Sequence, residues 1–211
     1  MQLLDDQSII LSMKNEKVQK KQNTRDILIR VGTEILTEKG FTNTGIEEIL
    51  KRVNVPKGSF YHYFKSKEAF GEAVIEHYAA YFSDKLDRLL TDTQHKPLQR
   101  LRNFVEEAKA GMQRYDFKRG CLVGNLGQEL GAVNDNYRHL LENVFLIWQE
   151  KVATCLREAQ SRDELSAQAD CEQLAAFFWI GWEGAILRAK LVRSTQPLEL
   201  FAAQFFSLFE S

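Results

Sequence analysis

Proline is scarce in this sequence of 211 residues, occurring only at Pro56, Pro97 and Pro197. Each proline lies between stretches whose apolar residues recur every three or four positions, which is the spacing of one face of an α-helix. Alternating runs of β-branched residues are also few, whereas Leu, Ala, Glu, Lys and Arg, which favour helices, are common. The sequence therefore predicts an all-α fold.

Cysteine is equally rare. Cys121, Cys155 and Cys171 are odd in number and far apart, and they form neither a Cys-x-x-Cys pair nor a cysteine–histidine cluster of metal-binding spacing. This pattern argues against a disulfide framework and against a zinc site. We expect the protein to use no metal and no cofactor.

Uninterrupted apolar runs of membrane-spanning length are missing, because the best candidate, LAAFFWIGWEGAILRAKL, contains Glu183, Arg188 and Lys190. The first residues carry Asp5 and Asp6 and too short an apolar stretch for a secretory signal. We therefore expect a cytoplasmic protein with no membrane partner.

Strong net charge is missing too. The formal net charge of −1 excludes a uniformly basic protein that coats nucleic acid. The charge is unevenly distributed, since residues 1–70 contain 12 Lys and Arg against 9 Asp and Glu. Residues 1–22 are interpreted as a basic N-terminal arm, and a solvated surface is the simpler explanation of its lysines. The N-terminal part is thus the better candidate for contact with phosphate.

Start and stop signals divide the chain into nine expected helices. The first covers residues 24–39, and Thr44 and Glu47 begin the second with the spacing of a capping box. A short third helix covers residues 57–63, and Ser66 caps a fourth that runs to about residue 90. Five further helices are expected to open near residues 97, 120, 134, 170 and 197.

The second and third helices form a predicted helix-turn-helix. A three-residue turn joins them, so the third helix can lie in a major groove of DNA while the second braces it. Phe60 and Phe64 are interpreted as core residues. Tyr61, His62 and Tyr63 are not, because one short helix cannot bury all of its faces. The polar and aromatic residues around them are the expected contacts with base edges and phosphates: Thr42, Thr44, Lys57, Gly58, Ser59, Tyr61, His62, Tyr63 and Lys67.

One ordered pattern extends across this region, comprising Gly40-Phe41, Thr44, Ile49, the run from Val55 to Phe64, and Ser66-Lys67-Glu68. In this pattern, residues 24 to about 70 resemble the DNA-binding domain of the TetR family of bacterial transcriptional regulators. The resemblance implies a nine-helix, homodimeric repressor or activator of a palindromic double-stranded DNA operator. It implies a helix-turn-helix domain at 23–68 and an effector-binding and dimerisation domain at 69–211.

The resemblance also implies DNA contacts at seven of these positions: Thr44, Gly58, Ser59, Tyr61, His62, Tyr63 and Lys67. Many family members have Tyr-His or Tyr-Tyr where this chain has His62-Tyr63. Which of the two rings meets a base and which meets a phosphate is therefore open.

Two C-terminal stretches, Arg119-Gly120-Cys121-Leu122 and Ala189 to Glu199, resemble a branch of that family. The branch includes regulators that sense reactive electrophiles such as quinones, maleimides and acrylate-like compounds. A cysteine in the first turn of a helix, following Lys118 and Arg119, is expected to have a favoured thiolate. Alternatively, Cys121 is a small buried side chain. The expected effector site comprises Cys121, Asn125, Trp148, Glu183 and Lys190.

The last two expected helices carry more apolar surface than one subunit covers, which favours a two-fold, four-helix dimer interface. Glu183 interrupts this apolar sequence, so it either reaches solvent or pairs with Arg188 or with a ligand. Trp148, Trp179 and Trp182 are interpreted mainly as core or interface residues, with Trp148 expected nearest a ligand.

These features together predict a sequence-specific DNA-binding regulator that a small molecule or an electrophile releases from its operator. The alternative is an enzyme that acts on small electrophiles with Cys121 as nucleophile and His95 or His139 as base. No orienting group or oxyanion site in the sequence supports that alternative, so we expect no catalytic residues.

Overall fold

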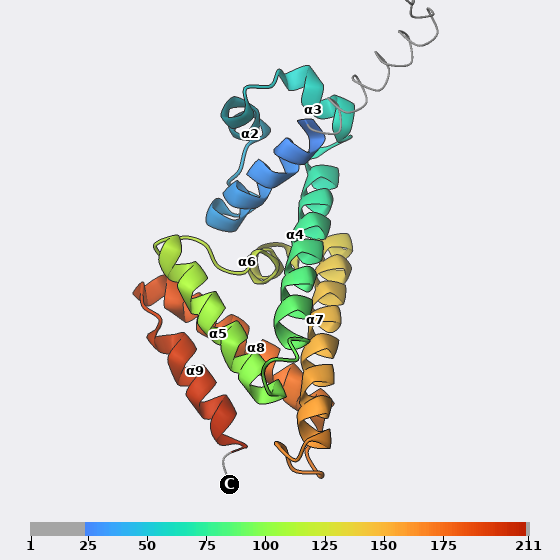
Figure 1. Cartoon of the computed structure of the whole chain (residues 1–211). Helices are drawn as coiled ribbons and strands as arrows, with labels where there is room; N and C mark the ends of the chain where they lie inside the picture. Colours follow the sequence, from blue (N-terminus) through green and yellow to red (C-terminus); the bar gives the residue numbers. More distant parts are fainter. Residues whose placement is uncertain (1–23, 210–211) are drawn as a thin grey trace, which may run out of the picture.

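The computed structural model describes residues 24–209 (Figure 1), so the N-terminal arm expected at residues 1–22 lies outside the described part. Within residues 24–209 the chain forms nine helices and no strand, which confirms the predicted all-α class. None of these described helices is long and apolar enough to cross a membrane. The first covers residues 24–39, and the others are α2 (Ile46–Val53), α3 (Lys57–Tyr63), α4 (Lys67–Leu90), α5 (Pro97–Arg114), α6 (Leu122–Leu130), α7 (Asp135–Ser161), α8 (Cys171–Val192) and α9 (Gln196–Ser207).

Helix 24–39, α2 and α3 form an N-terminal unit around a small aromatic core. Phe60, Phe64 and Phe70 are buried, and their ring centroids lie 4.9 to 5.3 Å apart. Asn54 ends α2 in the left-handed conformation with φ at 53°, and Pro56 precedes α3. Because the turn is short and the core holds both helices, α3 is fixed relative to α2 with its outer face free.

The capping box expected at the start of α2 does not form. Gly45 occupies the N-cap position, with no side-chain hydrogen bond to the helix. The Thr44 hydroxyl instead donates to the carbonyl of Gly40 at 2.6 Å and is buried under the loop. Gly40 has a φ of 80°, so the preceding helix ends in a left-handed turn, a conformation that glycine adopts readily.

The long helix α4 links the N-terminal unit to the rest of the chain (Figure 1), and α7 packs along it. Ser66 caps α4, accepting a hydrogen bond from the backbone of Ala69 at 3.1 Å, as predicted. Near this junction the Tyr137 hydroxyl donates to the carbonyl of Glu68 at 2.9 Å. A displacement of the start of α4 would therefore change contacts in both the N-terminal unit and the C-terminal part.

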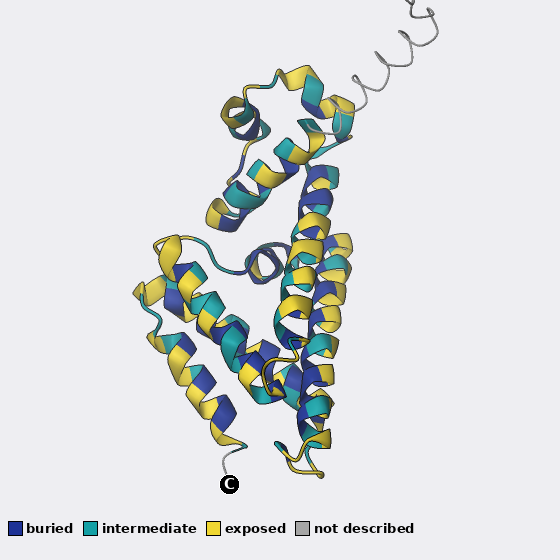
Figure 2. Ribbon diagram, viewed as in Figure 1, coloured by how far each residue is buried: buried dark blue, intermediate teal, exposed yellow. Residues whose placement is uncertain are grey.

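The C-terminal helices share one core, and their buried faces turn inward (Figure 2). Helix α8 packs against α7 on one side and α9 on the other. Arg100 is fully buried, where it pairs with Glu158 at 2.7 Å and donates to the carbonyl of Leu90 at 3.1 Å. These contacts of Arg100 fix α5 against α7 and against the end of α4.

Candidate nucleic-acid interface and internal cavity

Helix α3 presents its side chains in two directions. Phe60 faces the core, whereas Tyr61 is 52% exposed and His62 is exposed beside it. Tyr63 is half-buried, with its ring 5.1 Å from that of His62. Gly58 has open space where a Cβ would be. The outer face of α3 is therefore a short, rigid surface of aromatic edges and polar groups, which suits a DNA groove.

The other expected DNA contacts differ in accessibility. Thr42 and Lys57 are exposed, while Ser59 and Lys67 are half-buried. The Lys67 ammonium donates to the carbonyl of Phe41 at 2.6 Å and lies 4.4 Å from the centre of the Phe41 ring. Thr44 is completely buried, so its hydroxyl does not reach a phosphate in this conformation. That part of the expectation is corrected, because tertiary packing covers Thr44.

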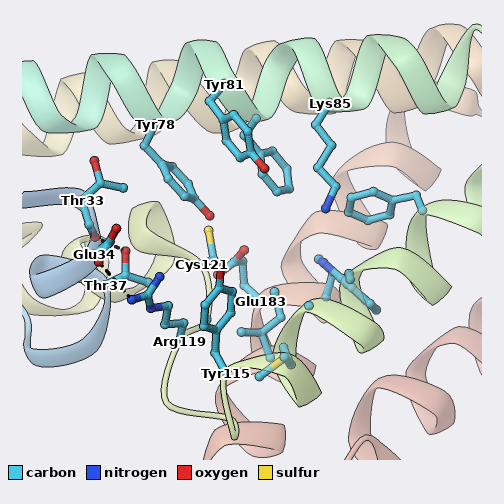
Figure 3. A pocket seen from close by; sticks show the side chains of 18 of the residues that line it. Thr33, Glu34, Thr37, Tyr78, Tyr81, Lys85, Tyr115, Arg119, Cys121 and Glu183 are labelled. Carbon is cyan, nitrogen blue, oxygen red and sulfur yellow. Dashed lines mark hydrogen bonds and ion pairs between the residues drawn. The ribbon is translucent and has the colours of Figure 1, made fainter. Parts of the chain in front are cut away.

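A cavity of about 320 Å³ lies inside the molecule, mainly among helices that follow the N-terminal unit (Figure 3). Its walls come from α4, α5, α8 and the segment that leads into α6. Most of the lining surface is apolar or aromatic, as is usual for a small-molecule site, and several polar and ionisable side chains also line it. The aromatic lining residues are Tyr78, Tyr81, Phe82, Phe104, Tyr115, Trp179 and Trp182.

The cavity also touches the N-terminal unit. Thr33, Glu34 and Thr37 of helix 24–39 belong to its wall. Arg119 spans the two parts, since its guanidinium lies 2.7 Å from the carboxylate of Glu38 and 3.4 Å from that of Glu34. Anything that enlarges or fills the cavity therefore acts directly on the first helix of the unit that carries α3.

Helix α6 forms a second link between the cavity and the N-terminal unit. Cys121 is its N-cap residue, and the sulfur accepts a hydrogen bond from the backbone of Gly124 at 3.4 Å. At the other end, the Glu129 carboxylate accepts hydrogen bonds from the backbone N–H of Phe41 at 2.8 Å and of Thr42 at 2.6 Å. Burial opposes ionisation of Glu129, but these hydrogen bonds outweigh it and lower its pKa.

Two of the five expected effector residues, Cys121 and Glu183, line the cavity. Asn125 and Lys190 meet each other at 3.3 Å outside its lining, and Asn125 also donates to the carbonyl of Thr37 at 3.0 Å. Trp148 is buried behind the wall.

The expectation that Trp148 lies nearest the ligand is corrected in favour of Trp179 and Trp182, which do line the cavity. The sequence carried a signal for this, because Trp179, Trp182, Glu183 and Ile186 share one face of α8 at spacings of three and four. The aromatic residues of α4 that line the cavity, Tyr78, Tyr81 and Phe82, are not among the effector residues expected from the sequence.

The expected activation of Cys121 is also corrected. Burial raises the pKa of the Cys121 thiol well above its ordinary value, and the neighbouring Glu183 carboxyl raises it further. Lys118 pairs with Asp116, and Arg119 pairs with Glu34 and Glu38. Lys190 is hydrogen-bonded to Asn125, although its charge still interacts with Cys121. The N-cap position and the Gly124 N–H favour the thiolate, but burial outweighs them.

Glu183 is the most unusual ionisable group in the cavity wall. Its Oε1 atom is buried with no hydrogen-bond partner among the described residues. Burial raises the pKa of Glu183 from 4.5 to about 7, and hydrogen bonding with Cys121 opposes this shift only in part. Of the alternatives from the sequence, the carboxyl neither faces bulk solvent nor pairs with Arg188. It lies beside Cys121 at the cavity surface (Figure 3).

This environment makes stability depend on pH in a defined direction. Between pH 4.5 and about 7 the folded protein binds the Glu183 proton more tightly than the unfolded chain does. The free energy of unfolding therefore falls as pH rises through this range, by about 2–3 kcal/mol from this group. Glu183→Gln is expected to raise the unfolding temperature relative to wild type at about pH 8 but much less at about pH 5.

Thermal unfolding followed by circular dichroism at both pH values measures this difference. Glu76→Gln, on an exposed part of α4, is the matched control and should change neither value. An equal effect of Glu183→Gln at both pH values would contradict the prediction.

The remaining candidates for cysteine chemistry lie elsewhere. His95 is bonded to Asp92 at 2.8 Å, and the exposed His139 lies on α7; neither lines the cavity. Cys155 is buried and its thiol donates to the carbonyl of Pro97 at 3.3 Å. Burial raises its pKa to about 12. Cys171 is likewise buried.

The chain matches models of a known protein family. Residues 28–74 match the family model described as bacterial regulatory proteins, tetR family. Residues 97–205 match the model described as tetracyclin repressor-like, C-terminal domain. The chain belongs to the TetR family. It is a DNA-binding transcriptional regulator, not an enzyme, and regulators of the TetR family bind DNA operators and act as dimers with small-molecule effectors.

Two curated TetR-family relatives illustrate the likeness. The chain is 54% identical over 178 residues to transcriptional regulator AcuR from Cereibacter sphaeroides, covering 84% of this chain and 81% of AcuR. It is 33% identical over 180 residues to the HTH-type transcriptional repressor NemR from Escherichia coli strain K12, covering 85% of this chain and 90% of NemR.

Solved TetR-family structures agree with this assignment. A crystal structure of regulatory protein TetR from Rhodobacter sphaeroides superimposes with a TM-score of 0.82 at 54% identity, covering 85% of this chain and 95% of that one. The reduced form of E. coli NemR gives a TM-score of 0.77 at 31% identity, covering 86% of this chain and 95% of that one.

Proposed function

We propose that this regulator is released from a palindromic operator when a small molecule or an electrophile occupies the internal cavity. The observation that carries this proposal is the shared wall: Thr33, Glu34 and Thr37 of the N-terminal unit line the same cavity as Cys121 and Glu183 of the C-terminal part. A ligand that fits only one arrangement of these helices shifts the population toward it. Operator release then follows from movement of α3.

The DNA-binding surface in this proposal is the exposed side of α3 and its neighbours, within residues 23–68. Tyr61 and His62 contact base edges, while Thr42, Lys57 and Lys67 contact phosphates. Gly58 supports the assignment, because open space at this position lets a DNA backbone approach closely. Ser59 and Tyr63 complete the surface at its half-buried edge.

The dimer forms through α8 and α9 of residues 69–211. On α8 an exposed stripe has the three- and four-residue spacing of a helix-packing seam: Phe177, Ile180, Gly184, Leu187 and Leu191. Gly184 is open to solvent, so a partner helix can approach the backbone there. Leu200 on α9 and Leu208 just after its end extend the exposed apolar surface. Two copies of this surface form a two-fold interface.

Two recognition helices held in one dimer contact half-sites about 34–36 Å apart or at a multiple of that distance. A modest rotation of either N-terminal unit breaks the match with both half-sites. The cytoplasmic location expected for a reader of operator DNA is part of this proposal, as is the electrophile sensitivity of Cys121, with Lys190 and Asn125 as a supporting pair behind it.

The test uses N-ethylmaleimide as the electrophile and a fluorescent duplex bearing the operator. Alkylation is expected to weaken operator binding by at least about tenfold, equivalent to about 1.4 kcal/mol. Cys121→Ser should keep its affinity after the same treatment, whereas Cys155→Ser should lose it like the wild type. If alkylated wild type and untreated wild type bind equally, Cys121 is not the trigger. Affinity no better than for random DNA at the same salt would exclude operator recognition itself.

A further inference from the structure

Three ionisable side chains meet at one point of the cavity wall (Figure 3). Tyr78 of α4 points its hydroxyl toward the sulfur of Cys121, and the carboxyl of Glu183 lies on the other side of that sulfur. The pKa of Tyr78 is raised by burial and then by the charge of the neighbouring cysteine. A ligand that regulates the protein only by filling the cavity needs no such cluster of ionisable groups. The presence of the cluster therefore requires a separate explanation.

The cysteine of this cluster is a thiol rather than a preformed thiolate, because its pKa is raised by burial and by Glu183. A neutral thiol is a poor nucleophile, and rapid attack on an electrophile requires a base that removes the proton as the bond forms. The geometry offers one carboxyl within reach of the sulfur, that of Glu183. In its charged form Lys190 has no lone pair to accept the proton, and its ammonium donates to Asn125 at 3.3 Å.

Gly124 explains how the carboxyl reaches this position. A Cβ at Gly124 would lie 1.8 Å from Oε2 of Glu183, so any side chain there would displace the carboxyl. The same glycine donates its backbone N–H to the Cys121 sulfur at 3.4 Å. One residue thus leaves room for the base and also holds the nucleophile. The other carboxyl oxygen, Oε1, is buried without a partner.

We propose that Glu183 is the general base for addition of the Cys121 thiol to an uncharged α,β-unsaturated carbonyl compound, with Tyr78 donating a hydrogen bond to the carbonyl oxygen. The inference deepens the proposed function, on which it rests, by naming the reacting groups and the ligand class. An uncharged ligand is specified because the base must be ionised, and an anionic ligand beside it would be repelled. The aromatic walls and the volume of about 320 Å³ suit a small planar molecule.

The proposed step balances without any oxidant. The sulfur forms a bond to the β-carbon, the π electrons of the C=C bond move toward the carbonyl oxygen, and the thiol proton passes to the Glu183 carboxylate. Tyr78 stabilises the negative charge that develops on that oxygen. Glu183 then returns the proton to the α-carbon. The product is a thioether on Cys121, and the carboxylate is restored.

A purely electrostatic role for Glu183 makes the opposite prediction. If the carboxylate only raises the pKa of the thiol, Glu183→Gln lowers that pKa and accelerates alkylation at neutral pH. If Glu183 is the base, the same substitution slows alkylation by about a hundredfold. The sign of the change therefore distinguishes the two roles.

The experiment measures N-ethylmaleimide addition to Cys121 by intact-protein mass spectrometry, in the full chain carrying Cys155→Ser and Cys171→Ser. Rates are recorded from about pH 5 to about pH 9. The wild-type rate is expected to rise as Glu183 ionises near pH 7 and then to level off. Tyr78→Phe is expected to lower the rate about tenfold without moving the profile. A Glu183→Gln rate equal to or above that of wild type would overturn the proposal.

Other titrating groups around the cavity are controlled for. Besides Tyr78 and Cys121, the ionisable side chains that line it with Glu183 are Glu34, His77, Tyr81, Lys85, Tyr115 and Arg119. Arg119 is paired with Glu34, and Lys85 is paired with Glu107 at 3.1 Å. His77 is the exposed member that most resembles an alternative base, and His77→Asn must leave the profile unchanged.

The wild-type profile keeps the proposal testable even if Glu183→Gln fails to fold, because a rate that climbs only above about pH 9 would exclude a carboxylate base. Operator affinity measured on the same samples separates the two levels of inference. Alkylation that depends on Glu183 but does not release the operator would support Glu183 as the base and exclude Cys121 alkylation as the trigger. Alkylation that does not depend on Glu183 but does release the operator would exclude Glu183 as the base and support the trigger.

Discussion

Replacing His62 with alanine is expected to weaken operator binding by about 1–3 kcal/mol at each half-site, and by about twice that in the dimer. His62 lies exposed on α3, next to Tyr61 and outside the core formed by Phe60. Truncation therefore removes a DNA contact and the ring contact with Tyr63 but leaves the core intact. Fluorescence anisotropy with a labelled operator, at fixed salt and with a random duplex for comparison, measures the change.

The sequence dependence of this variant also resolves the open assignment of the two neighbouring rings. If His62 contacts a base, specificity relaxes at that base pair; if it contacts a phosphate, affinity falls about equally for all sequences. His139→Ala removes an exposed histidine from α7, far along the chain, and is the matched control. Operator affinity unchanged by His62→Ala would contradict the proposed orientation of α3.

Replacing Ile180 with glutamate is expected to convert the dimer into monomers. Ile180 is 76% exposed at the middle of the α8 stripe, where the proposal buries it against a second copy. Each subunit would lose about 1.5–3 kcal/mol of apolar burial, and a carboxylate would be desolvated in addition. Analytical ultracentrifugation at micromolar concentration measures the mass, and operator binding should fall with it because both half-sites are needed.

Ile147→Glu provides the matched control on α7. Ile147 is 54% exposed but lies outside the α8–α9 stripe, so the same exchange there should leave the dimer intact. A dimer that survives Ile180→Glu would refute the proposed interface. Loss of the dimer with Ile147→Glu but not with Ile180→Glu would indicate that the interface lies on α7 instead.

The elements that could be predicted from the sequence are those whose determinants lie within a few residues of one another. Pro56 and Ser66 bracket α3 because a missing N–H and a capping hydroxyl act locally. Phe60 and Phe64 were assignable to the core because α3 is too short to bury more than one face. The family resemblance added the identity of the outer face, since its residues form one continuous run.

Tertiary structure alone decided the chemistry of the cavity. The position of Cys121 at the start of a helix after two cations predicts a lowered pKa, yet burial and a carboxyl from α8 raise it. Thr44 also has the sequence of a capping residue, but it is buried and its hydroxyl donates to the carbonyl of Gly40 instead. For Cys121 the deciding carboxyl is distant in sequence, and the energy of desolvation, which no local pattern encodes, exceeds that of the local interaction.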